Sequence, residues 1–333
     1  MRIVSDTQVQ ELLGNLTPEL ITSYQNILAT ALQQYHFDPS LIPERIVINK
    51  PSISNATHIF MPSFTSTHTG IKTLGGSVEG FKGAVLILDK DNGVVKGMVN
   101  AMSLTGFRTA LASSLALRKF FEVEKKNQVM SVYGNGAQAY WHVKVTLSAY
   151  PGNFNKVNLI VRSRNEKSLE LVKALQSEFP DVEFELIENG PAVDLKSSTV
   201  IYGCIPSTTP SIHLDQLATD HQVFISLIGS YKPNMFEVDD AIVLKAKTSG
   251  KIMVDSYEHT LAEAGELIKN RIDKRHVIEL GELEYIEKED IVDPKKSNLV
   301  LAKIVGLSIM DVAVGGYILE KAKQQNIGIE TDF

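Results

Sequence analysis

The sequence predicts an α/β fold in which a doubly wound parallel sheet is inserted into a split α+β domain. Short runs with β character fill residues 45–100, and from residue 128 short apolar runs alternate with helical segments, as in βαβ units. Helical periodicity returns near Asn298, so we expect the last helical segment to pack back onto the first block. The length of 333 residues also favours two domains. The expected split domain comprises 1–115 with 300–333, and the inserted domain 116–299.

The N-terminal block is predicted to begin with two helices in residues 1–36. Thr17 and Pro18 have the composition of an N-cap followed by the first helical position. A mostly antiparallel sheet or partial barrel follows, with a hairpin turn at 89–93, where Asp-Lys-Asp-Asn-Gly separates two strands. A helix over 105–121 ends the block. The expected strands are 45–49, 58–62, 70–73, 83–89 and 94–100.

The inserted block is predicted to alternate strands with helices. A turn and helix cover 134–150, a second helix covers 165–179, and an apolar helical stretch runs from about Leu299 to Gln325. This rhythm predicts a parallel sheet of Rossmann type. The expected strands are 128–133, 156–162, 182–187, 198–203, 223–228, 241–244 and 251–255.

Composition excludes several classes of function. The net charge is −6, and no basic stripe is interleaved with aromatic residues, so a nucleic-acid partner is not expected. No apolar stretch reaches the ~18 residues of a membrane span, and the N-terminus lacks the apolar core of a secretory signal. The single cysteine, Cys204, suits a reducing compartment. We therefore expect a cytoplasmic protein without a membrane or metal site.

The turn after the first strand of the inserted block carries the sharpest motif, Gly134-Asn135-Gly136-Ala137-Gln138-Ala139. Glycine at 134 permits a tight turn, glycine at 136 lets a diphosphate approach the backbone, and Ala139 keeps helix and strand close. The helix N-terminus then offers N–H groups to the phosphates. The motif predicts a dinucleotide site; a plain structural turn is the alternative.

The end of the second strand indicates which dinucleotide is bound. It carries Arg162-Ser163-Arg164-Asn165 and no acid that would take a ribose 2′-hydroxyl. A guanidinium at 164, with Ser163 and Asn165 beside it, suits a 2′-phosphate. NADP(H) is therefore favoured and NAD(H) stays possible. The alternative is that the two arginines are solvated charges at a strand end.

Ordered landmarks over nearly the whole chain resemble the ornithine cyclodeaminase/mu-crystallin family. The resemblance implies a Rossmann-type domain inserted in a split domain that also forms a homodimer, with a small amino or imino acid bound between the domains, facing the nicotinamide. The landmarks are Ile42-Pro43-Glu44-Arg45, Met61-Pro62, Gly70-Ile71-Lys72, the hairpin at 88–93, the segment 104–110, the glycine turn, Ile228-Gly229-Ser230, Glu237-Val238-Asp239, the segment 279–282 and the segment from Gly306 to Asp311.

The same resemblance implies site residues. Arg45, Lys72 and Arg108 would line the substrate site, where cations hold a carboxylate; solvated surface charges are the alternative. Arg108 and Thr109 would also touch the cofactor phosphates. Further cofactor contacts would come from Gln138 and from the strand ends Cys204-Ile205 and Ile228-Gly229. Cys204 itself is interpreted as an apolar filler with no basic partner, and Trp141 and His142 as packing residues.

The chain departs from the cyclodeaminase pattern in the substrate half. Tyr231 stands where cyclodeaminases carry the acid that handles protons around the amine. Ile59 replaces the glutamate for the distal amine, and Ala302-Lys303-Ile304 replaces Phe-Lys-Ser.

These departures favour an NADP(H)-dependent oxidoreductase acting on a small amino or imino acid, of the ketimine or pyrroline-carboxylate reductase type. Lys72 is the first candidate proton donor and Tyr231 the second. The alternatives are an ornithine cyclodeaminase, a protein that stores NADPH and a small ligand without turnover, and a scaffold that binds no nucleotide.

Overall fold

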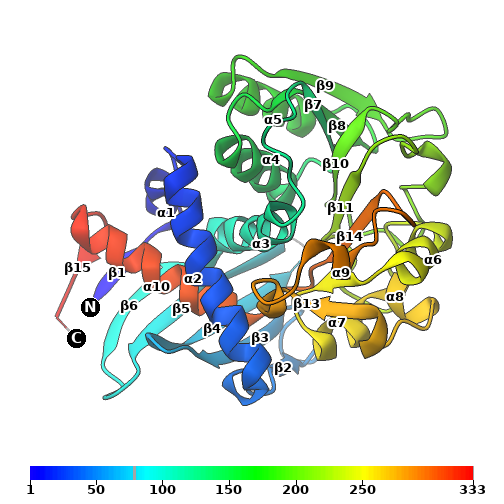
Figure 1. Ribbon diagram of the computed structural model, residues 1–333. Coiled ribbons are helices and arrows are strands. Elements are labelled where there is room, and N and C mark those ends of the chain that lie inside the picture. The colour runs from blue at the N-terminus through cyan, green and yellow to red at the C-terminus, as the bar shows by residue number, and fades with distance from the viewer. Residues whose placement is uncertain (78–79, 333) are drawn as a thin grey trace. The chain divides into compact units, whose positions relative to one another are not determined.

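The computed structural model describes residues 1–77 and 80–332, and the chain folds into two compact units (Figure 1). Unit 1 comprises Met1–Arg108 and Gly306–Phe333, and unit 2 comprises Thr109–Val305. The first division lies inside helix α3 (Ala101–Arg118) and the second lies after strand β14 (Leu299–Lys303). The expected divisions were 115/116 and 299/300. Among the described residues, no helix combines the length and hydrophobicity needed to span a membrane.

Unit 1 is built on an open sheet of seven strands in the order β15-β1-β6-β5-β4-β3-β2. Its strand pairs are antiparallel except β1 with β6, so the predicted mostly antiparallel sheet is confirmed. The strands are β1 (Arg2–Val4), β2 (Ile46–Asn49), β3 (Thr57–Phe64), β4 (His68–Ser77), β5 (Gly80–Asp89), β6 (Val95–Asn100) and β15 (Ile329–Glu330), and the helices are α1 (Asp6–Leu12), α2 (Pro18–Phe37), α10 (Ser308–Gln324) and a short turn Pro39–Leu41.

The helix cap and the hairpin turn predicted for unit 1 are both present. Thr17 caps α2 by accepting a hydrogen bond from the backbone N–H of Leu20 at 3.2 Å, with Pro18 in the first turn. At the β5–β6 hairpin the N–H of Gly93 donates to the carbonyl of Asp89 at 3.0 Å. The φ of Gly93 is +74°, a left-handed conformation that glycine adopts without strain.

The two faces of the unit 1 sheet differ in burial. On one face α10 packs against β3, β4, β5 and β6, and Lys72, Val85 and Val99 form a cross-strand row that is fully buried. The neighbouring positions point to the other face. There Pro62, Ile71, Leu86, Met98 and Ile3 form a row of partly exposed apolar side chains.

Unit 2 is a parallel sheet of eight strands in the order β13-β12-β14-β11-β10-β7-β8-β9. The strands are β7 (Gln128–Tyr133), β8 (Phe154–Val161), β9 (Glu183–Glu188), β10 (Ser198–Gly203), β11 (Val223–Leu227), β12 (Ile252–Val254), β13 (Val277–Glu279) and β14 (Leu299–Lys303). The helices are α4 (Ala137–Ala149), α5 (Glu166–Glu178), α6 (Asp240–Ser249), α7 (Tyr257–Glu263), α8 (Gly265–Lys269) and α9 (Lys288–Ile291), with short 3-10 turns Leu214–Gln216, Lys274–His276 and Leu280–Glu282.

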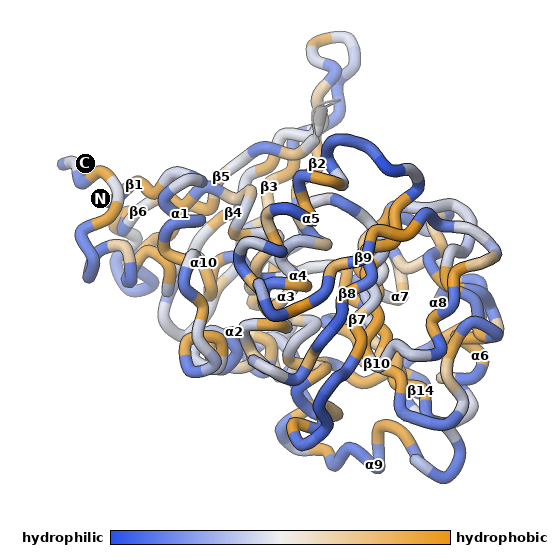
Figure 2. Tube along the Cα trace, turned by 90° about the horizontal axis from the view of Figure 1, so that it is seen from above, coloured by the Kyte–Doolittle hydropathy of each residue, from blue (hydrophilic) through white to orange (hydrophobic). Residues whose placement is uncertain are grey.

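The strand order of unit 2 is that of a doubly wound sheet. The chain runs outward from β7 to β8 and β9, then returns to β10 on the other side of β7, so β7 and β10 flank the point where the order reverses. The strands β11 and β14 are buried along their whole length, and β7, β8, β10 and β14 are largely hydrophobic in Figure 2, as expected of a sheet covered on both faces. The predicted α/β fold class is confirmed.

The predicted helical stretch from Leu299 to Gln325 is wrong at its beginning. Residues Leu299–Lys303 form β14, which pairs with β11 and β12, and only Ser308–Gln324 is helical. A short run that is apolar throughout suits a buried strand and a buried helix equally, so periodicity does not separate them. Gly306, with φ +92°, lies between the two elements.

Other secondary-structure predictions also fail locally. The expected strand 241–244 belongs to helix α6. Its N-cap is Asp239, whose side chain accepts a hydrogen bond from the N–H of Ile242 at 3.0 Å. Residues Arg2–Val4 are a strand rather than part of a helix, because Ser5 caps the first helix. The strands β13 and β15 were not predicted; they have three and two residues, too few for a pattern.

Candidate functional site

The glycine turn of unit 2 leaves a helix N-terminus open. Gly134 follows β7 with φ +118°, and a Cβ there would lie 3.1 Å from the carbonyl oxygen of Cys204. Gly136 is the N-cap of α4 and makes no side-chain cap hydrogen bond, and a Cβ on it would meet nothing within 4 Å. The first N–H groups of α4 have no partner within the helix and carry a partial positive charge, the arrangement that binds an anion.

The next two strand ends lie beside this turn. The N–H of Cys204 donates to the carbonyl of Tyr133 at 3.0 Å, and the N–H of Ile228 to that of Gly203 at 2.8 Å. A Cβ on Gly229 would lie only 2.1 Å from the carbonyl oxygen of Ile205. The structure therefore brings the glycine turn, Cys204-Ile205 and Ile228-Gly229 to one edge of the sheet, the carboxyl ends of β7, β10 and β11.

These residues fit a dinucleotide. A diphosphate would be held by the backbone of Gly134–Gln138, since only glycine at 136 leaves room for it. Oε1 of Gln138 is buried and, within the described part of the chain, has no hydrogen-bond partner; such a group is ready to accept a bond from a ligand. Asn135 donates from Nδ2 to Oδ1 of Asn165 at 3.4 Å and so links the turn to the end of β8.

The end of β8 carries both signs of charge. Arg164, Ser163 and Asn165 are exposed; Asn165 caps α5, and the guanidinium of Arg164 donates to the carbonyl of Leu186 at 2.8 Å. The backbone N–H of Arg164 donates to Oε1 of Glu188 at 3.2 Å. Sequence reasoning missed this acid because it belongs to β9, and only the register Val161↔Glu188 brings it to the end of β8.

Cys204 has a neighbour that the sequence did not predict. Its sulfur lies 4.0 Å from Nδ1 of His142, but this nitrogen donates its proton to the carbonyl oxygen of Gln138 at 2.7 Å and offers the thiol no base. The two residues are 62 positions apart, and α4 and β10 bring them together. Burial raises the pKa of the thiol and lowers the pKa of His142 to about 4. His142 is therefore neutral near pH 7, and Cys204 stays an unreactive thiol as expected.

Unit 1 contains a buried cluster of two cations and one carboxylate, Lys72, Arg108 and Asp311. Nζ of Lys72 lies 2.8 Å and Nε of Arg108 3.2 Å from the same oxygen, Oδ1 of Asp311. Nζ of Lys72 also donates to Oγ1 of Thr105 at 2.9 Å. The second oxygen of Asp311 is buried and, among the described residues, has no hydrogen-bond partner. The three side chains come from β4, α3 and the first turn of α10.

The cluster carries one more positive than negative charge. Burial lowers the pKa of Lys72 to about 8; Asp311 opposes this and Arg108 adds to it. A buried group of net positive charge attracts a carboxylate. In the sequence Asp311 is only a landmark of the family resemblance; its one signal is that it is the sole charged residue in the apolar run 304–316. The predicted residues Lys72 and Arg108 do lie together.

Arg45 differs from the three buried members of this cluster in its exposure to solvent. It is exposed and precedes β2. Extending the β2–β3 register by one residue puts Arg45 opposite Met61, whose partner in β4 is Lys72. Arg45 thus shares a cross-strand row with Lys72, two strands or roughly 10 Å away. Thr109, the first residue of unit 2, is buried in α3.

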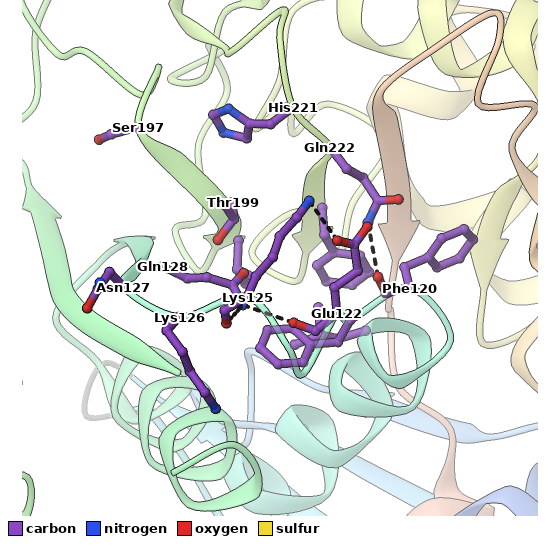
Figure 3. A pocket seen from close by; sticks show the side chains of 14 residues that line it. Phe120, Glu122, Lys125, Lys126, Asn127, Gln128, Ser197, Thr199, His221 and Gln222 are labelled. Carbon is purple, nitrogen blue, oxygen red and sulfur yellow. Dashed lines mark hydrogen bonds and ion pairs between the residues drawn. The ribbon is translucent and has the colours of Figure 1, made fainter. Parts of the chain in front are cut away.

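A cavity of about 340 Å³ in unit 2 lies at the edge of the sheet opposite to the glycine turn (Figure 3). Gln128 and Thr199, at the beginnings of β7 and β10, line it. Lys125 forms an ion pair with Glu122 at 2.7 Å. Lys126, which also lines the cavity, donates from Nζ to Oδ1 of Asn153 at 3.2 Å. The cavity lies at the amino ends of the strands rather than beside the glycine turn.

Comparison with known proteins agrees with this arrangement. An uncharacterized protein of Saccharomyces cerevisiae is 32% identical over 94% of this chain and 95% of its own length. A Delta(1)-pyrroline-2-carboxylate reductase of Bacillus cereus is 24% identical over 92% of this chain and 93% of its own. The structure of the Thermococcus litoralis Delta(1)-pyrroline-2-carboxylate reductase, in complex with NADH and L-proline, shares the fold with a TM-score of 0.80 at 19% identity, covering 99% of this chain and 100% of that one.

The family model described as "Ornithine cyclodeaminase/mu-crystallin family" matches residues 37–326. This span includes the glycine turn, the strand ends beside it, and all three members of the buried cluster. The predicted resemblance is confirmed: the chain belongs to the ornithine cyclodeaminase/mu-crystallin family.

Proposed function

We propose that this protein is a nicotinamide-dependent imine reductase that acts on a small cyclic imino acid, such as a pyrroline-2-carboxylate. The observation that carries the proposal is the buried cluster of Lys72, Arg108 and Asp311, which combines a net positive charge, an ammonium of lowered pKa and an unpartnered carboxylate oxygen. A cyclic imino acid carries the complementary groups, a carboxylate and a basic ring nitrogen.

Each member of the cluster has a distinct task in this proposal. Arg108 holds the substrate carboxylate through its guanidinium. Lys72 gives a proton to the ring nitrogen, and Asp311 holds the ammonium of Lys72 at its Oδ1 while its free Oδ2 accepts the N–H that forms. When bound, the nicotinamide nucleotide supplies the hydride for the C=N carbon. One hydride and one proton thus convert the C=N bond to CH–NH. Arg45 is proposed to guide the carboxylate to the cluster.

The lyase alternative is disfavoured by the residues at two positions. Tyr231 and Ile59 stand where the resemblance implies acids. Tyr231 is 42% exposed and lies on the turn after β11, so it remains the second candidate proton donor. A protein that only stores a ligand would bind nucleotide and imino acid without consuming either.

We propose NADP(H) as the preferred cofactor. Arg164 supports this, because its exposed guanidinium lies at the end of β8, where a ribose 2′-phosphate would be recognised. Glu188 disfavours NADP(H), because its carboxylate accepts a hydrogen bond from the backbone N–H of Arg164 and would repel a phosphate bound there. NAD(H) is the alternative. Gly134–Gln138, Cys204-Ile205 and Ile228-Gly229 serve either nucleotide, and Thr109 and Arg108 are proposed to contact its phosphates.

We further propose that the protein is a homodimer in the cytoplasm. The apolar row of Ile3, Pro62, Ile71, Leu86 and Met98 on the unit 1 sheet supports pairing with a second copy, since such rows mark interfaces. Light scattering after gel filtration, with Ile71→Lys and Leu86→Lys as disrupting variants, tests the dimer. The single thiol, Cys204, suits a reducing compartment.

A steady-state assay tests the reductase. Purified protein is supplied with NADPH or NADH and Δ1-pyrroline-2-carboxylate, and absorbance of the reduced nucleotide is followed along with formation of proline. Consumption of one nucleotide per proline supports the proposal. Tight binding of nucleotide without turnover of any cyclic imine favours the storage protein, and formation of proline and ammonia from ornithine without net nucleotide consumption favours the lyase.

A further inference from the structure

A second buried ionic cluster lies in unit 2 and has no part in the proton transfer proposed above. It consists of Ser230, Glu237, Glu266 and Lys303, and each is at most 1% exposed. Lys303 is the last residue of β14, Glu266 lies in α8, and Ser230 and Glu237 lie in the segment between β11 and α6. The cluster therefore gathers at the carboxyl edge of the parallel sheet, the edge that carries the glycine turn.

Lys303 is at the centre of this cluster. Its Nζ lies 2.8 Å from Oγ of Ser230, 3.3 Å from Oε1 of Glu266 and 3.6 Å from Oε1 of Glu237. Oγ of Ser230 lies 2.6 Å and 2.8 Å from the two carboxylate oxygens of Glu266. One cation is thus shared by two carboxyl groups and a hydroxyl.

The bonds of the cluster converge on the turn that follows β11. The N–H of Gly229 donates to both carboxyl oxygens of Glu237, at 2.9 Å and 2.8 Å, and the next residue, Ser230, is bonded to Glu266 and Lys303. The same turn packs on the peptide of Ile205, because a Cβ at Gly229 would lie 2.1 Å from its carbonyl oxygen. The turn is therefore fixed on its buried side by hydrogen bonds and at its edge by close backbone packing.

Burying the charged groups of this cluster is unfavourable in free energy. Burial raises the pKa of Glu237 to about 8; Lys303 opposes this effect and Glu266 adds to it. Replacing buried ion pairs by apolar residues is often neutral or stabilising, so such a cluster is weak support for stability alone. Its hydrogen bonds instead specify one conformation of the backbone at 228–231.

The position of that turn indicates which part of a dinucleotide it serves. The glycine turn after β7 takes the diphosphate, and the end of β8 takes the adenosine ribose. The ends of β10 and β11 lie on the side of β7 opposite to β8. They are therefore placed to contact the nicotinamide half of the dinucleotide. We propose that Glu237, Glu266 and Lys303 are positioning residues that hold the turn Ile228–Tyr231 for the nicotinamide end of the dinucleotide. This inference rests on the proposed use of a nicotinamide cofactor.

The test compares whole dinucleotides with ligands that lack the nicotinamide. Calorimetry on the full-length protein measures Kd for NADH against ADP-ribose, and for NADPH against 2′-phospho-ADP-ribose. Glu237→Leu removes the acceptor of the Gly229 N–H but leaves Lys303 paired with Glu266, so the buried charge stays balanced. We expect Kd for the whole dinucleotides to rise at least about tenfold, the effect of one lost buried hydrogen bond, and Kd for the truncated ligands to stay within about twofold.

Glu237→Gln is the matched control. It keeps the shape and one acceptor oxygen for Gly229, so we expect most of the affinity to return. Equal loss for whole and truncated ligands in Glu237→Leu, or no loss for either, overturns the inference, as does a Gln variant as weak as the Leu variant. Failure of the wild-type protein to bind NADH and NADPH is a different outcome, which overturns the proposed cofactor and this inference with it. Thermal unfolding of both variants without ligand shows whether each is folded.

Discussion

Nζ of Lys72 lies 2.8 Å from Oδ1 of Asp311, although 239 positions separate the two residues. Lys72 belongs to β4 of the N-terminal sheet and Asp311 to the first turn of α10, and neither side chain is more than 2% exposed. The proposed proton donor and its counter-charge therefore come from distant parts of the chain.

Removing the ammonium of Lys72 tests its role as proton donor. We expect Lys72→Met to lower kcat for imine reduction by about 10²- to 10⁴-fold, the usual contribution of a positioned general acid. Steady-state kinetics with a saturating reduced nucleotide measures the effect. Lys96→Met is the control, because Lys96 is more than a third exposed and pairs with Asp89 at the hairpin. Unchanged turnover in the Lys72 variant would assign the proton to another group, with Tyr231 next in line.

The pH dependence of reduction follows from the same lysine. Burial lowers the pKa of Lys72 to about 8, and only the protonated ammonium donates. Below this pH Lys72 is protonated and the rate is at its maximum; above it the rate falls about tenfold for each pH unit. Initial rates of kcat/KM between pH 6 and pH 10 measure this limb. A profile that stays flat to pH 10 would contradict the role of Lys72.

Asp311→Asn removes the counter-charge from two buried cations. Because Asp311 raises the pKa of Lys72, its loss should move the alkaline limb of the pH profile to lower pH. Two unpaired buried cations should also cost about 3–5 kcal/mol of the free energy of unfolding, measurable by urea denaturation. Glu320→Gln, on the exposed side of the same helix, should change neither. An alkaline limb that stays in place in a folded Asn variant would show that Asp311 does not act on Lys72.

Gly136→Ala tests the location of the diphosphate without disturbing the fold. A Cβ at this position meets nothing within 4 Å, and the φ of −98° suits alanine, so the unfolding temperature should stay close to that of the wild type. The methyl group would occupy the space that the phosphates need, so affinity for either nucleotide should fall at least about tenfold. Gly190→Ala, equally uncrowded, is the control. Full nucleotide affinity in the Gly136 variant would place the ligand elsewhere.

Arg164→Ala separates the two cofactors. If the guanidinium binds a 2′-phosphate, Kd for NADPH should rise by about 10- to 100-fold, as expected for a charge-assisted pair, while Kd for NADH changes little. Glu188→Gln should act in the opposite direction on NADPH, because it removes a repelling charge from the backbone of Arg164. Fluorescence titration of the wild type and both variants with each nucleotide measures these dissociation constants. A wild-type protein that binds NADH more tightly, with no effect of Arg164→Ala, would establish NAD(H) as the cofactor.

The parts of the structure that were predictable from sequence depend on local signals. The β7–turn–α4–β8 unit was predictable because glycine at 134 and 136, an apolar strand and a helix follow one another within 35 residues. Strand β14 was not, because its five residues are buried on both faces and show no period. The partners Asp311, Glu188 and His142 were missed for a common reason: register or packing, and not spacing along the chain, brings each to its neighbour.

The same physical reason limits what was predicted of the buried cluster around Lys303. In the sequence Lys303 is only the lysine kept from the family's Phe-Lys-Ser pattern, between Ala302 and Ile304. Nothing there indicates that it contacts Ser230, Glu237 and Glu266. A lysine at the end of an apolar strand is ordinarily solvated. The parallel pairing of β14 with β11 on one side and β12 on the other encloses it.

The division of unit 1 between two chain segments has a consequence for synthesis on the ribosome. Unit 2 is continuous from Thr109 to Val305, so all its strands have been translated before α10 leaves the exit tunnel. Before α10 emerges, the sheet of unit 1 lacks the helix that packs on it. Lys72 and Arg108 also lack their ion-pair partner Asp311. Domains generally fold as units during translation. Unit 2 is therefore the first unit that can fold completely. Unit 1, although it begins the chain, can be completed only after α10 has been synthesised.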